Sequence, residues 1–445
     1  MNPVITSKSS GAILDYQPFR PWRYDSAKVD ISNVIAPPYD VISQEKQKKL
    51  YQKSPYNCVR LILNLKEAAD NEQKNTYTRA KGFFNEWRQK GILVQDDEPS
   101  FYVYSQTFKD PISGKNKTRY ALLGRVRLEP FEKGIIIPHE KTLSAPKQDR
   151  LKLITAVQAN LSPVFGLYKD DKKEISKVLQ DPGNSKELFE AEDDDRITHT
   201  LSRIDDPKHI AKIHQAMKTK KVYIADGHHR YETALEYSRL RREEIQASEK
   251  DVFPFDYVYM ALVSFDDPGF IVLPTHRIVS DLGMSGKEAL KKLETCFKIE
   301  KSSIKKLEQI AISEKDDPIS FGLLLKDEGA FLLTLKDRET AKTKMVQGKP
   351  EIWYDLNVNL FGHLILAGLL GIPESQWESL LKFDHTVEGA VAITKKEKAQ
   401  AAFFLKAPKV EMLEKMGAVG ERMPQKSTFF YPKLATGLVF YSHQG

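Results

Sequence analysis

One segment decides how the middle of the chain folds, and it reads Val222-Tyr223-Ile224-Ala225-Asp226-Gly227-His228-His229-Arg230-Tyr231-Glu232-Thr233-Ala234-Leu235. Its first residues are apolar and typical of a short strand, a polar turn centred on Gly227 follows, and an amphipathic helix begins next. The first backbone N–H groups of a helix lack partners and lie at the positive end of the helix dipole, so an anion can bind there. Arg230 can add a bidentate contact. The segment therefore predicts a phosphate-binding loop.

Two other interpretations of this loop stay open. Asp226-Gly227 is common as a hairpin turn without a ligand, but Tyr231 and Ala234 share a helical face, whereas a hairpin would continue into a strand. Asp and His are also frequent metal ligands, yet the string lacks the i,i+4 His pair of a helical zinc site. A hydrated magnesium ion carried by a nucleotide fits better, because that ion needs only one or two carboxylates plus phosphates.

The composition indicates a soluble globular protein of two or three domains, with 445 residues, 41% of them hydrophobic. The net charge of +7 comes from basic residues that alternate with acidic ones, which gives only weak attraction to nucleic acid. Cys58 and Cys296 are far apart and have no metal-type spacing. The first eleven residues do not resemble a secretory signal, so we expect a cytoplasmic protein. The most apolar segment, 360–372, is shorter than the roughly 20 residues that span a bilayer, and it predicts a buried helix.

The pattern of elements predicts an α+β (mixed α/β) chain with an N-terminal region over 1–133, a central region over 134–280 and a C-terminal region over 281–445. Ser43 is expected to cap the first long helix. We predict helices over 44–52, 75–90, 147–160, 206–218, 286–297 and 303–313. We predict strands over 57–65, 101–108, 120–128, 164–168, 319–325 and 330–335, with 260–265 and 270–273 as a further antiparallel pair.

A second polar loop, Pro138-His139-Glu140-Lys141-Thr142, holds a base, an acid and a cation within five residues. It can be an ordinary exposed loop, because loops are polar and variable. If the fold brings it to the phosphate loop, Glu140 could take a proton from a substrate hydroxyl while Arg230 holds the phosphate being moved. A third cluster, Thr275-His276-Arg277, is assigned to solvated surface.

Five motifs carry a resemblance to a known family. They are Ile35-Ala36-Pro37-Pro38-Tyr39-Asp40-Val41-Ile42-Ser43, the 138–142 loop, Ala159-Asn160-Leu161-Ser162-Pro163-Val164-Phe165-Gly166-Leu167-Tyr168, the segment over 224–234, and Arg422-Met423-Pro424-Gln425-Lys426-Ser427-Thr428. Through these motifs the chain is identified as a member of a widespread bacterial and archaeal family of uncharacterised conserved proteins, of the DUF1015 type. The resemblance runs over nearly the whole chain, and the family name carries no activity.

The loop over 226–230 is also similar to the phosphate-binding loop of the ParB/sulfiredoxin-like superfamily, which implies a core of that kind in the central region. Sulfiredoxins place a catalytic cysteine where this chain has His228, so sulfinic-acid reduction is disfavoured. Chromosome-partition proteins add a helix-turn-helix DNA reader, and no such block is visible, so no nucleic-acid partner is expected. Free-serine kinases share the Asp-Gly-His-His-Arg-like loop and use a Glu from a separate loop as the general base. By this similarity, Glu140 is the candidate general base.

The resemblance to free-serine kinases implies a nucleotide-dependent phosphotransferase that acts on a small hydroxyl-bearing metabolite, with ATP, ADP or another nucleotide and Mg²⁺ as cofactors and no membrane partner. The catalytic candidates are Glu140, Asp226 and His228, and Asp226 is also the candidate magnesium ligand. The candidates for binding phosphate or nucleotide are Gly227, His228, His229, Arg230, His139 and Lys141. The alternatives are a nucleotide-binding switch or partner-binding protein with little or no turnover, and an enzyme that hydrolyses a phosphorylated metabolite.

Overall fold

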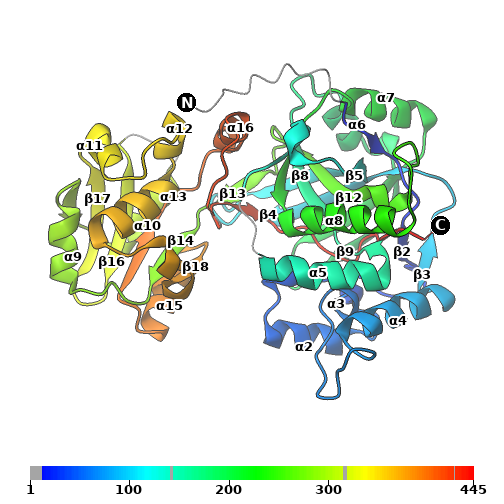
Figure 1. Cartoon of the computed structure of the whole chain (residues 1–445), viewed down its shortest axis with the longest axis horizontal. Coiled ribbons are helices and arrows are strands. Elements are labelled where there is room, and N and C mark those ends of the chain that lie inside the picture. Colours follow the sequence, from blue (N-terminus) through cyan, green and yellow to red (C-terminus); the bar gives the residue numbers. More distant parts are fainter. Residues whose placement is uncertain (1–12, 141–143, 314–317, 425, 445) are drawn as a thin grey trace. The chain divides into compact units, whose positions relative to one another are not determined.

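The computed structural model describes residues 13–140, 144–313, 318–424 and 426–444. The chain forms two compact units, each with helices and strands, which confirms the α+β class (Figure 1). Unit 1 comprises residues 1–138, 142–270 and 432–445, and unit 2 comprises 139–141 and 271–431. Most of the first two regions expected from the sequence therefore belongs to one unit, and the C-terminal tail returns to it.

A sheet of nine strands forms the centre of unit 1. Its strands are β1 (Tyr16–Gln17), β4 (Phe101–Lys109), β5 (Asn116–Arg127), β6 (Ile136–Pro138), β8 (Val164–Tyr168), β9 (Lys186–Glu192), β10 (Thr198–Ile204), β11 (Val222–Asp226) and β12 (Tyr257–Ser264). They lie in the order β6-β11-β8-β12-β5-β4-β10-β9, with β1 beside β5. The β6–β11 and β8–β12 pairs are parallel and the rest are antiparallel. The strands predicted over 101–108 and 120–128 are confirmed as β4 and β5, and they form an antiparallel hairpin with Tyr102 opposite Leu123.

Helices cover this sheet and supply part of its core. They are α1 (Ile31–Val34), α2 (Gln44–Lys53), α3 (Val59–Ile62), α4 (Thr76–Gln89), α5 (Ser144–Val157), α6 (Ser176–Gln180), α7 (Pro207–Met217) and α8 (His228–Glu244). Helices α5 and α8 lie side by side, and α4 packs against α5 (Figure 1). Ile154 of α5 and Ala234 of α8 join strand residues such as Val164 and Val222 in one hydrophobic core. Two short strand pairs complete the unit, β2 (Trp22–Tyr24) with β3 (Leu93–Gln95) and β7 (Ala159–Asn160) with β21 (Tyr441–Ser442).

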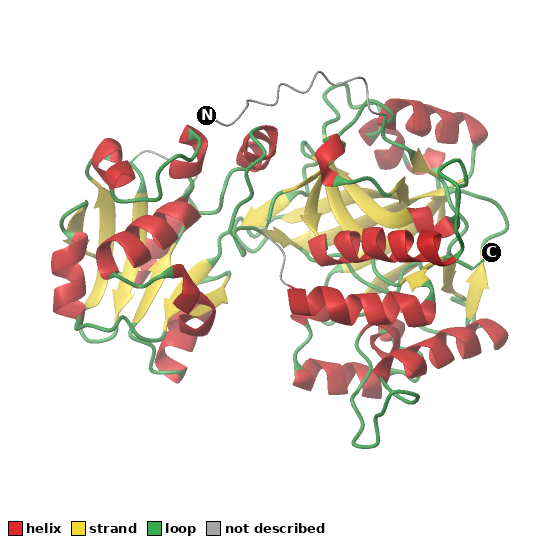
Figure 2. Cartoon of the chain, in the orientation of Figure 1, coloured by secondary structure: helices red, strands yellow, loops and turns green. Residues whose placement is uncertain are grey.

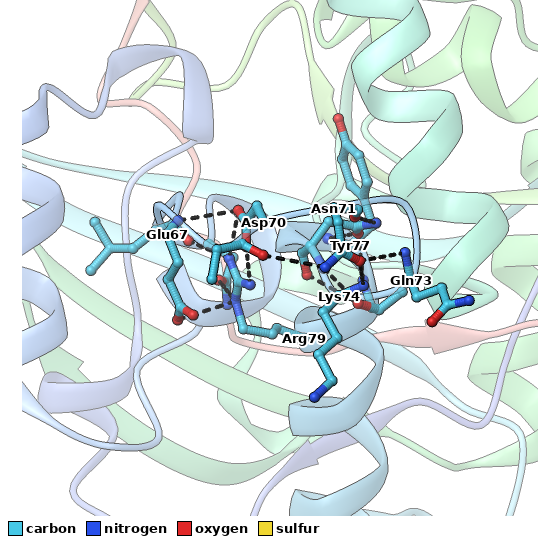
Figure 3. Close-up of polar contacts among 12 residues, drawn as sticks. Glu67, Asp70, Asn71, Gln73, Lys74, Tyr77 and Arg79 are labelled. Carbon is cyan, nitrogen blue, oxygen red and sulfur yellow. Dashed lines mark hydrogen bonds and ion pairs between the residues drawn. The ribbon is translucent and has the colours of Figure 1, made fainter.

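The start of α4 shows how local side chains fix a helix end (Figure 3). The Asn75 side chain accepts hydrogen bonds from the N–H groups of Tyr77 and Thr78, and the Thr78 hydroxyl accepts one from the Asn75 N–H, which completes a capping box. Arg79 of the first turn donates to Asp70 Oδ2 at 3.0 Å. These contacts confirm the helix predicted over 75–90. The Ser43 cap of α2 is confirmed as well.

Two predictions about strands were wrong. Helix α3 occupies the middle of the predicted strand over 57–65, because the side-chain oxygen Oδ1 of Asn57 accepts a hydrogen bond from the Val59 N–H and starts a helical turn there. The strand over 260–265 does not pair with 270–273; β12 pairs with β5 and β8 instead. The Asp267 carboxylate accepts from the N–H groups of Tyr120 and Gly269, which ties the following turn to β5. Strand β13 (Ile271–Leu273) pairs with β20 (Phe429–Tyr431).

Unit 2 is built on an antiparallel sheet of six strands (Figure 2). In sheet order they are β15 (Phe297–Lys301), β17 (Gly329–Leu335), β16 (Ser320–Leu325), β19 (Ala401–Phe404), β14 (His276–Val279) and β18 (Leu381–Asp384). Its helices are α9 (Gly286–Leu293), α10 (Ile304–Ala311), α11 (Arg338–Thr343), α12 (Glu351–Tyr354), α13 (Asn357–Asn359), α14 (Trp377–Leu380), α15 (Val387–Lys396) and α16 (Val410–Ala418). Leu307 of α10 and Ala390 of α15 pack against Ile278 and Phe404 of the sheet.

The apolar segment predicted as a buried helix forms a π-helix, η5 (Leu360–Leu370), and seven of its eleven residues are buried. Within the described residues, no single helix is long and apolar enough to span a membrane. The segments Asn357–Leu370 and Glu374–Leu380 would reach that length together, but a bend of 108° separates them.

Candidate functional site

The predicted strand, turn and helix of the phosphate loop are confirmed. Strand β11 ends at Asp226, Gly227 follows as the N-cap, and α8 begins at His228. Gly227 has φ 86° and ψ 28°, the left-handed conformation that favours glycine. A Cβ atom at this position would lie 2.9 Å from the Arg230 guanidinium, so that side chain would have to move. Because Gly227 has no side chain, it cannot accept a hydrogen bond from the N–H groups of the first turn of α8 through a side chain.

The Arg230 side chain folds back across this turn. Its guanidinium donates to the Pro163 carbonyl oxygen, and Nη2 donates to Asp226 Oδ2 at 3.3 Å. On the other oxygen of the same carboxylate, Oδ1, the Lys433 ammonium approaches to 3.7 Å. Two cations therefore lie beside one carboxylate at the end of β11. Lys433, which comes from the C-terminal part of unit 1, was not among the residues predicted from the sequence.

The two adjacent histidines have different surroundings. His228 is buried, with 7% of its surface exposed, and His229 is half-buried. Burial lowers the pKa of His229, although the carboxylates of Glu232 and Asp40 act in the opposite direction. The neutral imidazole is therefore the favoured form at neutral pH, and it can donate one hydrogen bond and accept another. Glu232 is also the partner of Lys147 on α5, at 2.8 Å.

A pocket of about 50 Å³ in unit 1 lies beside Arg230 and brings three sequence motifs together. Tyr39 comes from the 35–43 motif, Ser162 comes from the 159–168 motif, and Arg230 and Thr233 come from the phosphate loop and its helix. The remaining lining residues are Ile62, Arg150, Leu153, Ile154, Ala159, Asn160, Leu161 and Val258. Residues far apart in the sequence thus surround one space at the start of α8.

Arg150 of α5 is a charged pocket residue that was not among the candidates predicted from the sequence. Its guanidinium carbon lies 4.0 Å from the centre of the Tyr39 ring, and Nη1 donates to the Ile62 carbonyl oxygen at 2.7 Å. Burial raises the pKa of Tyr39, and the charges of Arg150 and Arg230 act against that rise. The only local signal for Arg150 is its position three residues after Lys147 on a predicted helix, which places both cations on one face.

His139 and Glu140 follow β6 and belong to the short segment 139–141 that is part of unit 2. Both contact Thr428. The Thr428 hydroxyl donates to Glu140 Oε1 at 3.2 Å, and its oxygen lies 3.0 Å from His139 Nε2. Because a hydroxyl has one hydrogen, His139 donates to Thr428 when Thr428 donates to Glu140. The backbone ties the same two segments together, since the Met423 N–H donates to the His139 carbonyl oxygen at 2.7 Å. Lys141 lies outside the described residues.

The predicted residues therefore divide between the two units: the 226–230 loop belongs to unit 1, and His139 and Glu140 belong to unit 2. The described part of the chain contains no group of three or more His, Cys, Asp or Glu residues arranged to hold a metal ion. The role of Asp226 as a magnesium ligand stays a prediction. The assignment of Thr275, His276 and Arg277 to solvated surface was wrong, because each is at most 3% exposed.

Comparison with known proteins gives a family and several distant structural likenesses. No curated protein matches the chain significantly. A solved structure of a free serine kinase in complex with AMP is 14% identical, covers 69% of this chain and 86% of its own, and has a TM-score of 0.33. A conserved hypothetical protein from Pyrococcus furiosus is 14% identical over 70% of this chain and 91% of its own, with a TM-score of 0.32. SbnI with a C-terminal truncation, from Staphylococcus aureus, is 8% identical over 71% and 86%, with a TM-score of 0.34.

The similarity to the ParB/sulfiredoxin-like superfamily stays a prediction. The family expected from the five motifs is confirmed, because the model described as "Protein of unknown function (DUF1015)" matches residues 16–359, well over half of the sequence. This chain belongs to that family.

Proposed function

We propose that this protein is a nucleotide-dependent phosphotransferase that moves a phosphoryl group from ATP or ADP to a hydroxyl of a small metabolite. The observation that carries the proposal is the convergence of Tyr39, Arg150, Ser162 and Arg230 on one pocket at the start of α8. Two guanidinium groups beside a helix start suit a polyphosphate, because arginine can bind phosphate oxygens in pairs and the helix dipole favours negative charge.

In this proposal the loop holds the phosphates with Gly227, His228, His229 and Arg230. Arg230 already lies across the turn, and its contact with Asp226 is a weak one at 3.3 Å that an incoming phosphate can replace. Asp226 would then be available to hold a magnesium ion or the acceptor hydroxyl. Phosphoryl transfer suits such residues, because the protein's task is mainly to position the groups and to neutralise charge.

Glu140 is the proposed general base, with His139 and Lys141 as further phosphate contacts. It would take the proton of the acceptor hydroxyl, whose oxygen forms a bond to the terminal phosphorus while the bond from that phosphorus to the nucleotide oxygen breaks. The hydrogen bond from Thr428 orients the Glu140 carboxylate. The arrangement supports a base that is held in place before the substrate binds.

Calorimetry tests the nucleotide site first. Titration of the purified chain with ATP, ADP and CTP in the presence of Mg²⁺ should give saturable binding of at least one of them, and Arg230→Ala and His229→Ala should weaken it at least tenfold. Arg239→Ala is a suitable control, because Arg239 lies on the same helix but is exposed and forms ion pairs with Glu236 and Glu243 at the surface. Nucleotide affinity that is unchanged by both loop variants would contradict the proposal.

Turnover is tested separately by incubating the protein with the nucleotide that binds and a panel of amino acids and sugars, with phosphorylated product as the readout. The proposed transferase forms such a product with at least one acceptor. Nucleotide binding without any transfer would support the nucleotide-binding switch instead. Release of phosphate from phosphorylated metabolites alone would support a hydrolase.

A further inference from the structure

Unit 2 contains a second cavity, of about 340 Å³, which shares no lining residue with the proposed phosphotransferase pocket of unit 1. All its lining residues belong to the 271–431 part of the chain. They come from β14, from the residue before β16, from the start of α11, from the α12–α13 region, from the chain after β19, from α16 with its N-cap, and from the chain before β20. A volume of this size is within the range of small-molecule sites, about 300 to 1,000 Å³.

A buried arginine forms part of the cavity wall. Arg277 of β14 is 3% exposed, and its guanidinium donates to the carbonyl oxygens of Thr275 and, at 3.0 Å, of Lys426. Two aromatic rings lie near it, those of Phe361 and Phe383, with centres at 5.9 and 5.8 Å. The guanidinium is thus fixed by backbone and rings, and its hydrogen-bond partners are uncharged.

The charge of Arg277 is not neutralised by a contacting carboxylate. Among the residues that the structure describes, none supplies a carboxylate within 4.0 Å of its nitrogens. Burial lowers the pKa of Arg277 to about 9, and the more distant Glu140 opposes that change, so the group is still charged at neutral pH. A buried charge without an ionic partner is unfavourable, and an anion that enters the cavity would relieve it.

The remaining lining defines the kind of anion. Among the described lining residues, Asp355 alone carries a carboxylate, which lies 3.4 Å from Arg338, and both side chains are about half exposed. The cationic lining residues are Arg277, Arg338, Lys406, Lys409 and Lys415. The wall is also apolar in part, through Ile319, Leu356, Leu405 and Met412. The buried Arg277 guanidinium next to this apolar surface fits a ligand with an anionic head and an apolar body.

We infer that the unit 2 cavity is a binding site for a small amphipathic anion, a carboxylate or phosphomonoester whose charged group contacts Arg277 and whose apolar part contacts the Leu356 and Leu405 side chains. The inference does not rest on the proposed phosphotransferase activity. Arg277 presents a planar guanidinium held by Thr275 and Lys426, which matches the paired oxygens of either head group.

Calorimetry on the full chain tests this site with three named probes: phenyl phosphate, phenylacetate and the neutral phenylacetamide. Both anions should bind and the amide should not, and the anion that binds more tightly identifies the preferred head group. Arg277→Gln should lower the affinity for both anions at least tenfold. Lys382→Gln should leave it unchanged, because Lys382 is an exposed cation of the same unit that contacts Glu397 and does not line the cavity.

Two further variants keep the test decisive. Arg230→Ala should bind the anions as the wild type does, since Arg230 belongs to the unit 1 pocket. If circular dichroism shows that Arg277→Gln does not fold, the exposed pair Arg338→Gln and Lys415→Gln, combined in one variant, should bind the anions several-fold more weakly. The inference is overturned if neither anion binds the wild type, if the folded Arg277→Gln or the double variant keeps wild-type affinity, or if Arg230→Ala abolishes binding.

Discussion

The guanidinium carbon of Arg150 lies 4.0 Å from the centre of the Tyr39 ring, so a residue of α5 is stacked on a residue of the Pro-Pro-Tyr-Asp turn. The same guanidinium also donates a hydrogen bond to the Ile62 carbonyl oxygen. The stacked arginine therefore has a defined place in the pocket before any ligand arrives. Preorganised charge of this kind strengthens binding, because less side-chain freedom is lost when the ligand binds.

Replacing Arg150 by methionine should weaken nucleotide binding by about 1 to 3 kcal/mol, or roughly tenfold to a hundredfold, because a charge-assisted contact to phosphate is lost. Calorimetry measures the change. Arg88→Met is the matched control: Arg88 also stacks on an aromatic ring, that of Trp22 at 4.3 Å, but it does not line the pocket. Equal affinities for Arg150→Met and Arg88→Met would show that Arg150 does not contact the nucleotide.

Gly227→Ala should damage the loop in two ways. The left-handed backbone disfavours a side chain by about 1 kcal/mol or more, and the new methyl group would also displace the Arg230 guanidinium, 2.9 Å away. Gly134→Ala separates the two effects, because Gly134 has φ 65° with open space around its Cβ position. Urea unfolding should show a loss of stability in both variants, whereas nucleotide affinity should fall only in Gly227→Ala. Normal affinity in Gly227→Ala would contradict the role of the Arg230 position.

The loop itself could be predicted from the sequence because its signals are local. An apolar run before Gly227 and a helical pattern after it fix the strand, the turn and the helix within about fifteen residues. Contacts between distant segments have no such signal. Lys433 reaches Asp226 from the C-terminal tail, and Arg150 reaches Tyr39 across most of the N-terminal region. The sequence around Lys433 and Arg150 shows two charged residues but does not show which distant residues they contact.

The predictions of strand pairing for 270–273 and of surface exposure for 275–277 failed for related reasons. The partner of β13 is β20, which lies far along the chain, and the nearest strand in sequence was the wrong choice. Arg277 and its two predecessors look polar, yet all three are buried, with Phe404 against His276 and with Phe361 and Phe383 near Arg277. Polarity predicted the surface there because sequence alone does not show which distant side chains cover a residue.

Stability should fall as the pH is lowered from about 6.5 to about 4, through His276. Burial, with a smaller contribution from Arg277, lowers the pKa of His276 to about 4, and its Nδ1 accepts a hydrogen bond from the Leu405 N–H. The unfolded chain, with a histidine pKa near 6.5, therefore binds a proton that the folded chain excludes in this window. The contribution present above pH 6.5 is about 3 kcal/mol, and it is lost as the pH approaches 4.

Urea unfolding at pH 7.5 and pH 5 measures this dependence. His276→Asn keeps an acceptor for the Leu405 N–H but cannot titrate, so the difference in unfolding free energy between the two pH values should shrink. His214→Asn, on a partly exposed face of α7, should leave that difference as in the wild type. A pH dependence that is the same in His276→Asn and the wild type would assign the effect to other groups, among them His443, whose pKa burial lowers to about 3.

Glu140 and Thr428 offer a test of the proposed chemistry that is independent of nucleotide affinity. Glu140→Gln should lower phosphoryl transfer by about 10² to 10⁴, the usual contribution of a general base, and should leave the nucleotide dissociation constant unchanged. Thr428→Val removes the hydroxyl that donates to Glu140 Oε1 at 3.2 Å, so the carboxylate is less firmly oriented. A smaller loss of kcat, about tenfold, is expected from this positioning residue.

Thr428→Ser is the matched control, because serine keeps the hydroxyl and the hydrogen bonds to both Glu140 and His139. It should transfer phosphate at close to the wild-type rate, while Thr428→Val should be slower with an unchanged KM for the nucleotide. Steady-state kinetics with the acceptor found in the screen separates kcat from KM. If Glu140→Gln transfers phosphate as fast as the wild type, the base is another group. If Thr428→Val and Thr428→Ser are equally slow, the threonine acts through packing and not through its hydroxyl.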